Sequence, residues 1–238
     1  SQQISALSTS QIQKLTTEAT GQIAAFTADQ IKGLTTAQIA AMAGNQLAAI
    51  EVEDFAALST SQVAAISTSQ MASLTPTQID AISSINSLTS SQLAQLDPAT
   101  ITAMSLEAFT ALTTAQIAGL SATQVGAFTT DQIQALSTAQ ARALTGAQLA
   151  AFNTDQLSYI EAEDMAALST LAIRSLATDS TGIGALSEDQ ILAMTTAQIA
   201  ALTTSQVQGL TSSSSGQIAQ MTSEQIRALT DRKSTRLN

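Results

Sequence analysis

The sequence predicts an all-α solenoid in which one short helix forms in every eight-residue repeat, here termed an octad. Three features predict it: a large apolar residue returns every eight positions, a Ser or Thr follows it, and a Gln stands four positions before the next one. The chain has 238 residues, of which 45% are hydrophobic, a fraction too high for a disordered chain. The repeats must therefore share a buried core.

The apolar residue at position 1 of each octad, here termed the landmark, excludes other folds. Landmarks run from Leu7 to Leu229; all 28 are Leu, Ile, Met or Phe, and 23 of the 27 intervals between them are eight residues long. In one continuous helix, eight residues turn about 800°, so an apolar stripe with this period would circle the helix. Coiled coils need other periods. In a strand, positions 1 and 6 would face opposite sides.

A helix that starts anew in every octad fits the remaining positions. Position 2 is Ser, Thr, Asp or Asn after 24 of the 28 landmarks, and Gln precedes the landmark by four residues in 21 of 28 cases. Ser or Thr followed three residues later by Gln is a capping box, and the apolar residues at positions 1 and 6 form the hydrophobic staple around it. Pro76 and Pro98 both fall on the first helical position, which tolerates proline best.

A single octad is too small to fold alone. Burial of its two large apolar side chains contributes about 3–6 kcal/mol, whereas ordering eight backbone residues costs about 8–16 kcal/mol. Stacked octads must therefore share their burial, and the Ala, Gly or Ser usual at position 8 would let neighbouring helices approach closely. The number of octads in one superhelical turn is left open.

The octads extend over residues 1–230 as one continuous solenoid. The intervals are irregular near residues 16–25, 83–87, 177–185 and 211–220, where Ser- and Gly-rich insertions or a deletion predict loops. Residues 231–238 leave the pattern and carry a basic cluster. They form either a basic tail or translated adapter sequence, and we assign them no function.

Two octads carry an acidic group in place of the usual cap. Residues 50–60 read IEVEDFAALST and residues 160–170 read IEAEDMAALST, which indicates duplication of a longer unit. We interpret the carboxylates as partners of a helix N-terminus. The alternative is a Ca²⁺ site, because hard cations prefer oxygen ligands. Its weak candidate ligands are Glu51, Glu53, Asp54, Glu161, Glu163 and Asp164. Three neighbouring carboxylates without a glycine turn are only a weak indication of a metal site.

The composition argues against catalysis and against nucleic-acid binding. The chain contains no His and no Cys, and its abundant Ser and Thr already serve as helix caps. No phosphate-binding loop is present, so we expect no enzyme, no cofactor and no small-molecule substrate. The net charge of −10 disfavours nucleic acid, and no apolar run is long enough to span a membrane.

The octads resemble a repeat of large bacterial proteins. LTTAQIAG at Leu112–Gly119 and TTAQIAAL at Thr195–Leu202 are similar to repeats of very large bacterial surface or secreted proteins labelled haemagglutinin-like or haem-utilisation/adhesion proteins. The resemblance implies an acidic, repetitive structural protein, extracellular or on the bacterial cell surface. It does not imply haem binding here, because only Met and one Tyr could ligate iron.

Three functions fit such a solenoid. The first is the stalk or spacer of an adhesin, the second a subunit of a self-assembling extracellular filament or sheath, and the third a protein-binding scaffold. Natural solenoids end in polar capping repeats, but the first and last octads are as apolar as the middle ones. We therefore expect self-association or neighbouring repeats of a longer chain.

Overall fold

The computed structural model describes residues 2–210 and 216–234, with side chains for 3–210 and 216–230. Every regular element in these ranges is helical and none is a strand. The chain divides into two compact units, Ser1–Gly119 and Leu120–Asn238.

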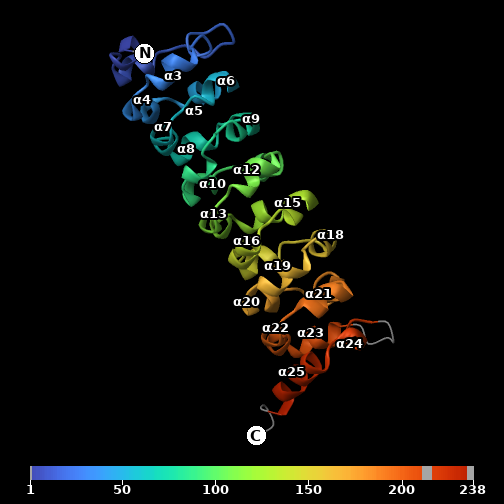
Figure 1. The fold of residues 1–238 in the computed structure, drawn as a ribbon. Helices are drawn as coiled ribbons and strands as arrows, with labels where there is room; N and C mark the ends of the chain where they lie inside the picture. Colours follow the sequence, from blue (N-terminus) through green and yellow to red (C-terminus); the bar gives the residue numbers. More distant parts are fainter. Residues whose placement is uncertain (1, 211–215, 235–238) are drawn as a thin grey trace. The chain divides into compact units, whose positions relative to one another are not determined.

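The first unit contains thirteen short α-helices and one 3₁₀ helix (Figure 1). They are α1 (Gln2–Ser5), α2 (Thr9–Ile12), α3 (Ala28–Lys32), α4 (Thr36–Ala41), α5 (Gly44–Ala48), α6 (Val52–Phe55), α7 (Thr60–Ala64), α8 (Thr68–Met71), α9 (Pro76–Asp80), η1 (Ile85–Ser87), α10 (Ser90–Leu93), α11 (Pro98–Thr102), α12 (Leu106–Thr110) and α13 (Thr114–Gly119).

The second unit repeats this organisation, with twelve α-helices and one 3₁₀ helix among its described residues. They are α14 (Ala122–Val125), α15 (Thr130–Gln134), α16 (Thr138–Ala143), α17 (Gly146–Leu149), α18 (Thr154–Ser158), α19 (Ala162–Ala167), α20 (Thr170–Arg174), η2 (Ile183–Ala185), α21 (Glu188–Ala193), α22 (Thr196–Ala201), α23 (Thr204–Gly209), α24 (Gln217–Gln220) and α25 (Ser223–Ser234).

The helices begin where the sequence predicts. In α4, the Thr35 hydroxyl accepts a hydrogen bond from the Gln38 backbone N–H at 3.2 Å, and Gln38 Oε1 accepts one from the Thr35 N–H at 2.8 Å. The same reciprocal pair opens most of the other helices, including α9, whose first residue is Pro76. Pro98 likewise begins α11. The capping-box register is therefore confirmed.

The landmark and position-6 side chains form the core of each unit. Ile39 and Met42 in the first unit and Ile133 and Leu136 in the second are all buried. Ala141, the position-6 residue that is not large, is buried as well. The small side chain therefore keeps its inward position.

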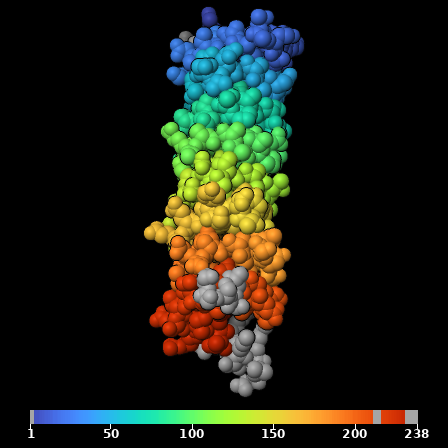
Figure 2. Space-filling view, turned by 90° about the vertical axis from the view of Figure 1, so that its right-hand side faces the viewer, coloured from blue at the N-terminus to red at the C-terminus, as the bar shows by residue number. Residues whose placement is uncertain are grey.

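In each unit, one superhelical turn consists of three octads. Helix α3 packs against α6, α4 against α7 and α5 against α8; in the second unit α15 packs against α18 and α16 against α19. Figure 1 shows α3, α6 and α9 stacked along one side of the first unit. The colour bands of Figure 2 succeed one another without mixing within each unit, as expected when each turn contacts only its neighbours.

Small residues at position 8 allow this close stacking. A Cβ built on Gly119 would lie 2.5 Å from the Cβ of Ser90, one turn earlier. A Cβ on Gly209 would collide with the carbonyl oxygen of Thr178. A larger residue at either position would force the turns apart.

The irregular intervals coincide with departures from the regular helix pattern. Residues 83–87 hold η1 and residues 177–185 hold η2, while residues 16–25 form turns without a helix. Residues 211–215 lie outside the described residues. Helix α25 is longer than an octad because no Gln–Ile pair after Leu229 starts a new one, and it runs through Ser234 into the predicted tail.

Candidate functional site: the acidic octads and a glutamine ladder

The first acidic octad lies at the start of α6. Glu51 is the N-cap residue but makes no side-chain capping bond, and Glu53 and Asp54 follow in the first turn. Glu51 and Glu53 are exposed and Asp54 is half-buried. This placement is the one expected of carboxylates beside a helix N-terminus.

The second acidic octad, at the start of α19, differs in one residue. Glu161 and Glu163 are exposed, but Asp164 is buried. Burial raises the pKa of the Asp164 carboxyl; the Thr138 hydroxyl, which hydrogen-bonds to it, opposes the rise, and the nearby Glu161 and Glu163 add to it. No group of three or more His, Cys, Asp or Glu side chains that could hold a metal ion is found in either octad or elsewhere among the described residues.

The most regular polar feature of both units is the row of position-5 glutamines, here termed the glutamine ladder. Most ladder glutamines belong to the capping box of their own helix, and most are also buried. Gln70 shows the arrangement: its Oε1 accepts from the Ser67 N–H at 2.6 Å, and its Nε2 donates to the carbonyl oxygens of Ile39 and Met42 at 2.8 and 2.7 Å. One side chain therefore starts its own helix and binds the preceding turn.

The same donation from Nε2 to the preceding turn recurs in both units. In the first unit it is made by Gln38, Gln46, Gln62, Gln70, Gln78, Gln92 and Gln116. In the second unit it is made by Gln148, Gln156, Gln190, Gln198, Gln206, Gln217 and Gln225. Nearly all accepting carbonyls belong to position-6 and landmark residues, which lie at the C-terminal end of a helix and at the start of the next.

The chemistry of the ladder requires Gln at position 5. A capping box accepts Glu as readily as Gln, because both provide an acceptor oxygen. Only Gln adds two N–H donors, which satisfy carbonyl groups that burial would otherwise leave unpaired. This second role is not evident from the capping-box motif alone. Its signal was the absence of Glu from the position that holds Gln in 21 of 28 octads.

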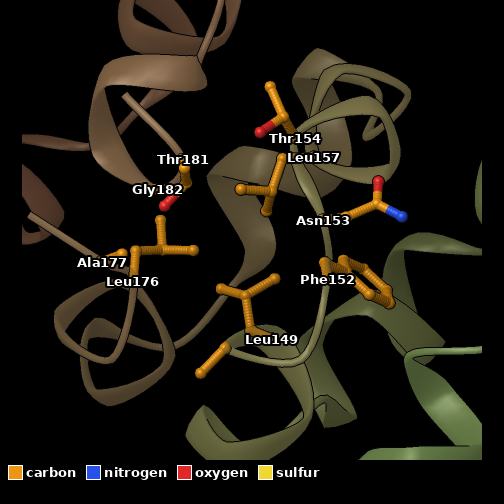
Figure 3. Close-up of a pocket in the computed structure, with 10 residues that line it drawn as sticks. Leu149, Phe152, Asn153, Thr154, Leu157, Leu176, Ala177, Thr181 and Gly182 are labelled. Carbon is orange, nitrogen blue, oxygen red and sulfur yellow. The ribbon is translucent and has the colours of Figure 1, made fainter. Parts of the chain in front are cut away.

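A break in the ladder produces a cavity in the second unit. Gly182 stands four residues before the landmark Leu186, where a ladder glutamine is usual, and a Cβ there would collide with the carbonyl oxygen of Ala177. Leu149, Phe152, Leu157 and Leu176 are among the residues that line a cavity of about 230 Å³ at this break, as Figure 3 shows. No described residue donates a hydrogen bond to the Phe152 carbonyl. The cavity therefore marks the place of a missing ladder residue.

Comparisons with known proteins agree with the repeat architecture. The ALTTAQ repeat family model matches residues 47–84 and 107–138. No curated protein and no solved structure matches the chain at a significant level. Both matched stretches therefore carry an ALTTAQ-type repeat, and the chain contains a repeat scaffold.

The described helices offer no membrane span. None of those within residues 2–210 and 216–234 is both long and apolar enough to cross a bilayer. Most are four to six residues long, and the longest, α25, has 12.

Proposed function

We propose that this chain is a structural spacer, the stalk of a bacterial cell-surface or secreted protein, and that it has no catalytic activity. The observation that carries the proposal is the glutamine ladder, which joins each turn to the one before it by paired hydrogen bonds, as at Gln70 and Gln198. Added turns extend such a structure by a repeated, self-contained unit. A spacer needs this property and an enzyme does not.

The exposed side chains fit a spacer better than a protein-binding scaffold. Binding surfaces gather large apolar and aromatic residues. The exposed large apolar residues of the described chain lie on or beside five different helices: Leu106, Tyr159, Leu171, Leu192 and Ile226. Isolated residues of this kind are ordinary on soluble proteins. The net charge of −10 favours solubility over nucleic-acid binding.

The location outside the cell rests on the resemblance of the octads to repeats of bacterial surface proteins. Ser, Thr, Gln and Ala dominate the sequence, and the absence of Cys leaves no thiol to be oxidised outside the cell. An extracellular stalk is therefore the function that we favour.

Distances between engineered cysteines test the spacer directly, because the chain has none of its own. Thr123, Ala147 and Leu171 are exposed, share position 4 and are separated by three octads each. Spin labels on Cys at 123 and 147 should give a narrow distance distribution, and labels at 123 and 171 a narrow one centred near twice that distance. Broad distributions, or equal distances for the two pairs, would refute a spacer of stacked turns.

A further inference from the structure

The glutamine ladder is interrupted over one whole turn of the second unit. The position-5 residues of three consecutive octads there are Asp164, Ala172 and Gly182. The first unit also has octads without a ladder glutamine, but never three in succession. Because one turn consists of three octads, the turn formed by α19, α20 and η2 has no glutamine to bind the preceding turn, formed by α16, α17 and α18. This interface is here termed the seam.

Three landmark carbonyls on the α16–α18 side of the seam lack a hydrogen-bond donor among the described residues. They belong to Leu136, Leu144 and Phe152, all of which are buried. At the next interface, the corresponding carbonyls all accept from a ladder glutamine: those of Ile160, Leu168 and Leu176. A buried carbonyl without a donor destabilises the packing that buries it, so the seam costs free energy that the next interface does not.

Packing across the seam is incomplete. Ala141 in α16 is the one position-6 residue that is not large, so it supplies less apolar contact than its counterparts. The cavity of about 230 Å³ also lies at the seam. Leu149 and Leu157 line it from one side, and Leu176 and Gly182 line it from the other, as Figure 3 shows. Side chains beside a cavity lose the dispersion contacts that a filled core would give them.

Two side-chain hydrogen bonds of other kinds cross the seam. The Ser175 hydroxyl donates to the Gly146 carbonyl at 2.7 Å, and the Thr138 hydroxyl hydrogen-bonds to Asp164. At the next interface a single ladder residue, Gln198, already donates to two carbonyls at 2.8 Å. The hydrogen bonds at the seam are therefore a weaker connection than a complete ladder.

The related region of the first unit keeps most of its ladder. Asp54 stands at position 5 of the first acidic octad, as Asp164 does in the second, but Gln62 and Gln70 follow it. Each of these glutamines donates to two carbonyls of the preceding turn. The loss of donors over a whole turn is therefore a property of the second unit and not of the acidic octads.

We propose that the second unit opens first at the seam, where the turn of α19, α20 and η2 separates from the turn of α16, α17 and α18 while the turns joined by the ladder stay folded. Turns of a solenoid contact only their neighbours, so one interface can open without the others. Opening lets water reach the three landmark carbonyls and thereby removes the cost of their burial. A spacer under tension lengthens first at this interface. That consequence rests on the proposed function, whereas the opening itself does not.

Amide hydrogen exchange of the full chain, followed residue by residue by NMR at pH 7, tests the proposal. The amide groups of Leu144 and Phe152 at the seam donate to carbonyls three residues earlier at 3.1 and 3.2 Å, and those of Leu34 and Met42 in the first unit do the same at the same distances. The carbonyls of this second pair accept from ladder glutamines. After correction for intrinsic rates, the seam pair should be protected at least about tenfold less. Equal protection of the two pairs would overturn the proposal.

Restoring one ladder residue should close the seam. Asp164→Gln supplies amide donors for the carbonyls of Ile133 and Leu136, and Asp164→Asn is the matched control, because it removes the same charge but is one methylene shorter. The Gln variant should protect the amides of Leu144 and Phe152 at least about fivefold more than the Asn variant does, and leave the first-unit pair unchanged. Equal protection in the two variants would contradict a seam caused by missing ladder donors.

The wild-type comparison does not depend on how well either variant folds. Neither measurement bears on the spacer function, because an opened form that is only a minor population leaves the distance distributions between spin labels narrow. Broad distributions would refute the spacer whether or not the seam opens.

Discussion

The two acidic octads have almost the same sequence but different surroundings. Asp54 and Asp164 occupy the same position, yet Asp54 is half-buried and Asp164 is buried. The difference lies one turn earlier. Helix α19 packs against α16, where Thr138 hydrogen-bonds to Asp164, whereas α6 packs against α3, where the corresponding residue is Ala28. An octad's properties therefore depend on the octad three repeats before it as well as on its own residues.

The largest effect should be common to both octads. Phe55 and Met165 are their position-6 residues, and both are fully buried. Replacing either with Ala should lower the free energy of unfolding by about 2–5 kcal/mol, because each substitution leaves a cavity. Urea unfolding of the two variants measures this. A small effect in one octad alone would show that only the other contributes to the core.

Thr138→Ala tests the contact that separates the two octads. Loss of the hydroxyl leaves the buried Asp164 carboxylate without this donor, which should cost about 1–2 kcal/mol at pH 7. Thr130→Ala, at the same position of the preceding octad, is the control and should change the free energy of unfolding by less than about 0.5 kcal/mol. Equal losses in the two variants would mean that the Thr138 hydroxyl does not support Asp164.

The pH dependence of unfolding should distinguish Asp164 from Asp54. A carboxyl whose pKa is raised by folding favours the folded state below its unfolded pKa, near 3.8, and loses that contribution as the pH rises through the folded pKa. Asp164→Asn should therefore stabilise the chain at pH 7, by about 1 kcal/mol, and the gain should vanish on acidification. Asp54→Asn should change it by less than about 0.5 kcal/mol. A gain at Asp164 that persists at acid pH would contradict the role of burial.

The smallest effect is expected from calcium. Both octads carry three carboxylates at the same positions, but the described carboxylates form no group that could hold a metal ion. Millimolar Ca²⁺ should therefore leave the melting temperature unchanged. A rise that Glu51→Gln with Glu161→Gln abolishes would restore the metal interpretation. The same double variant without Ca²⁺ is the control.

Local features of the fold could be predicted from the sequence, because they depend on neighbouring residues. The cap at Thr35, the helix start at Pro76 and the burial of Ile39 follow from residues within one octad. The number of octads per turn could not be predicted, since it depends on how helices far apart in the sequence pack. The burial of Asp164 was missed for the same reason.

The second role of the ladder glutamines depends partly on residues within one octad and partly on packing between octads far apart in the sequence. The capping box accounts for Gln70 within its own octad without using its two amide donors. Their acceptors, the carbonyls of Ile39 and Met42, belong to the preceding turn and cannot be located without the superhelical period. The preference for Gln over Glu at position 5 is the trace that this second role leaves in the sequence.

The central claim, that ladder glutamines join successive turns, is tested most directly by comparing Gln70→Glu with Gln11→Glu. The two residues share the local sequence Ser-Thr-Ser-Gln and the same capping box, but only Gln70 donates to a preceding turn. In dilute solution at pH 7, Gln70→Glu should lower the free energy of unfolding by about 2–5 kcal/mol, because two buried carbonyls lose their donors beside a buried charge. Gln11→Glu should change it by less than about 0.5 kcal/mol. Equal effects of the two substitutions would show that the glutamines act only as caps and would contradict the ladder.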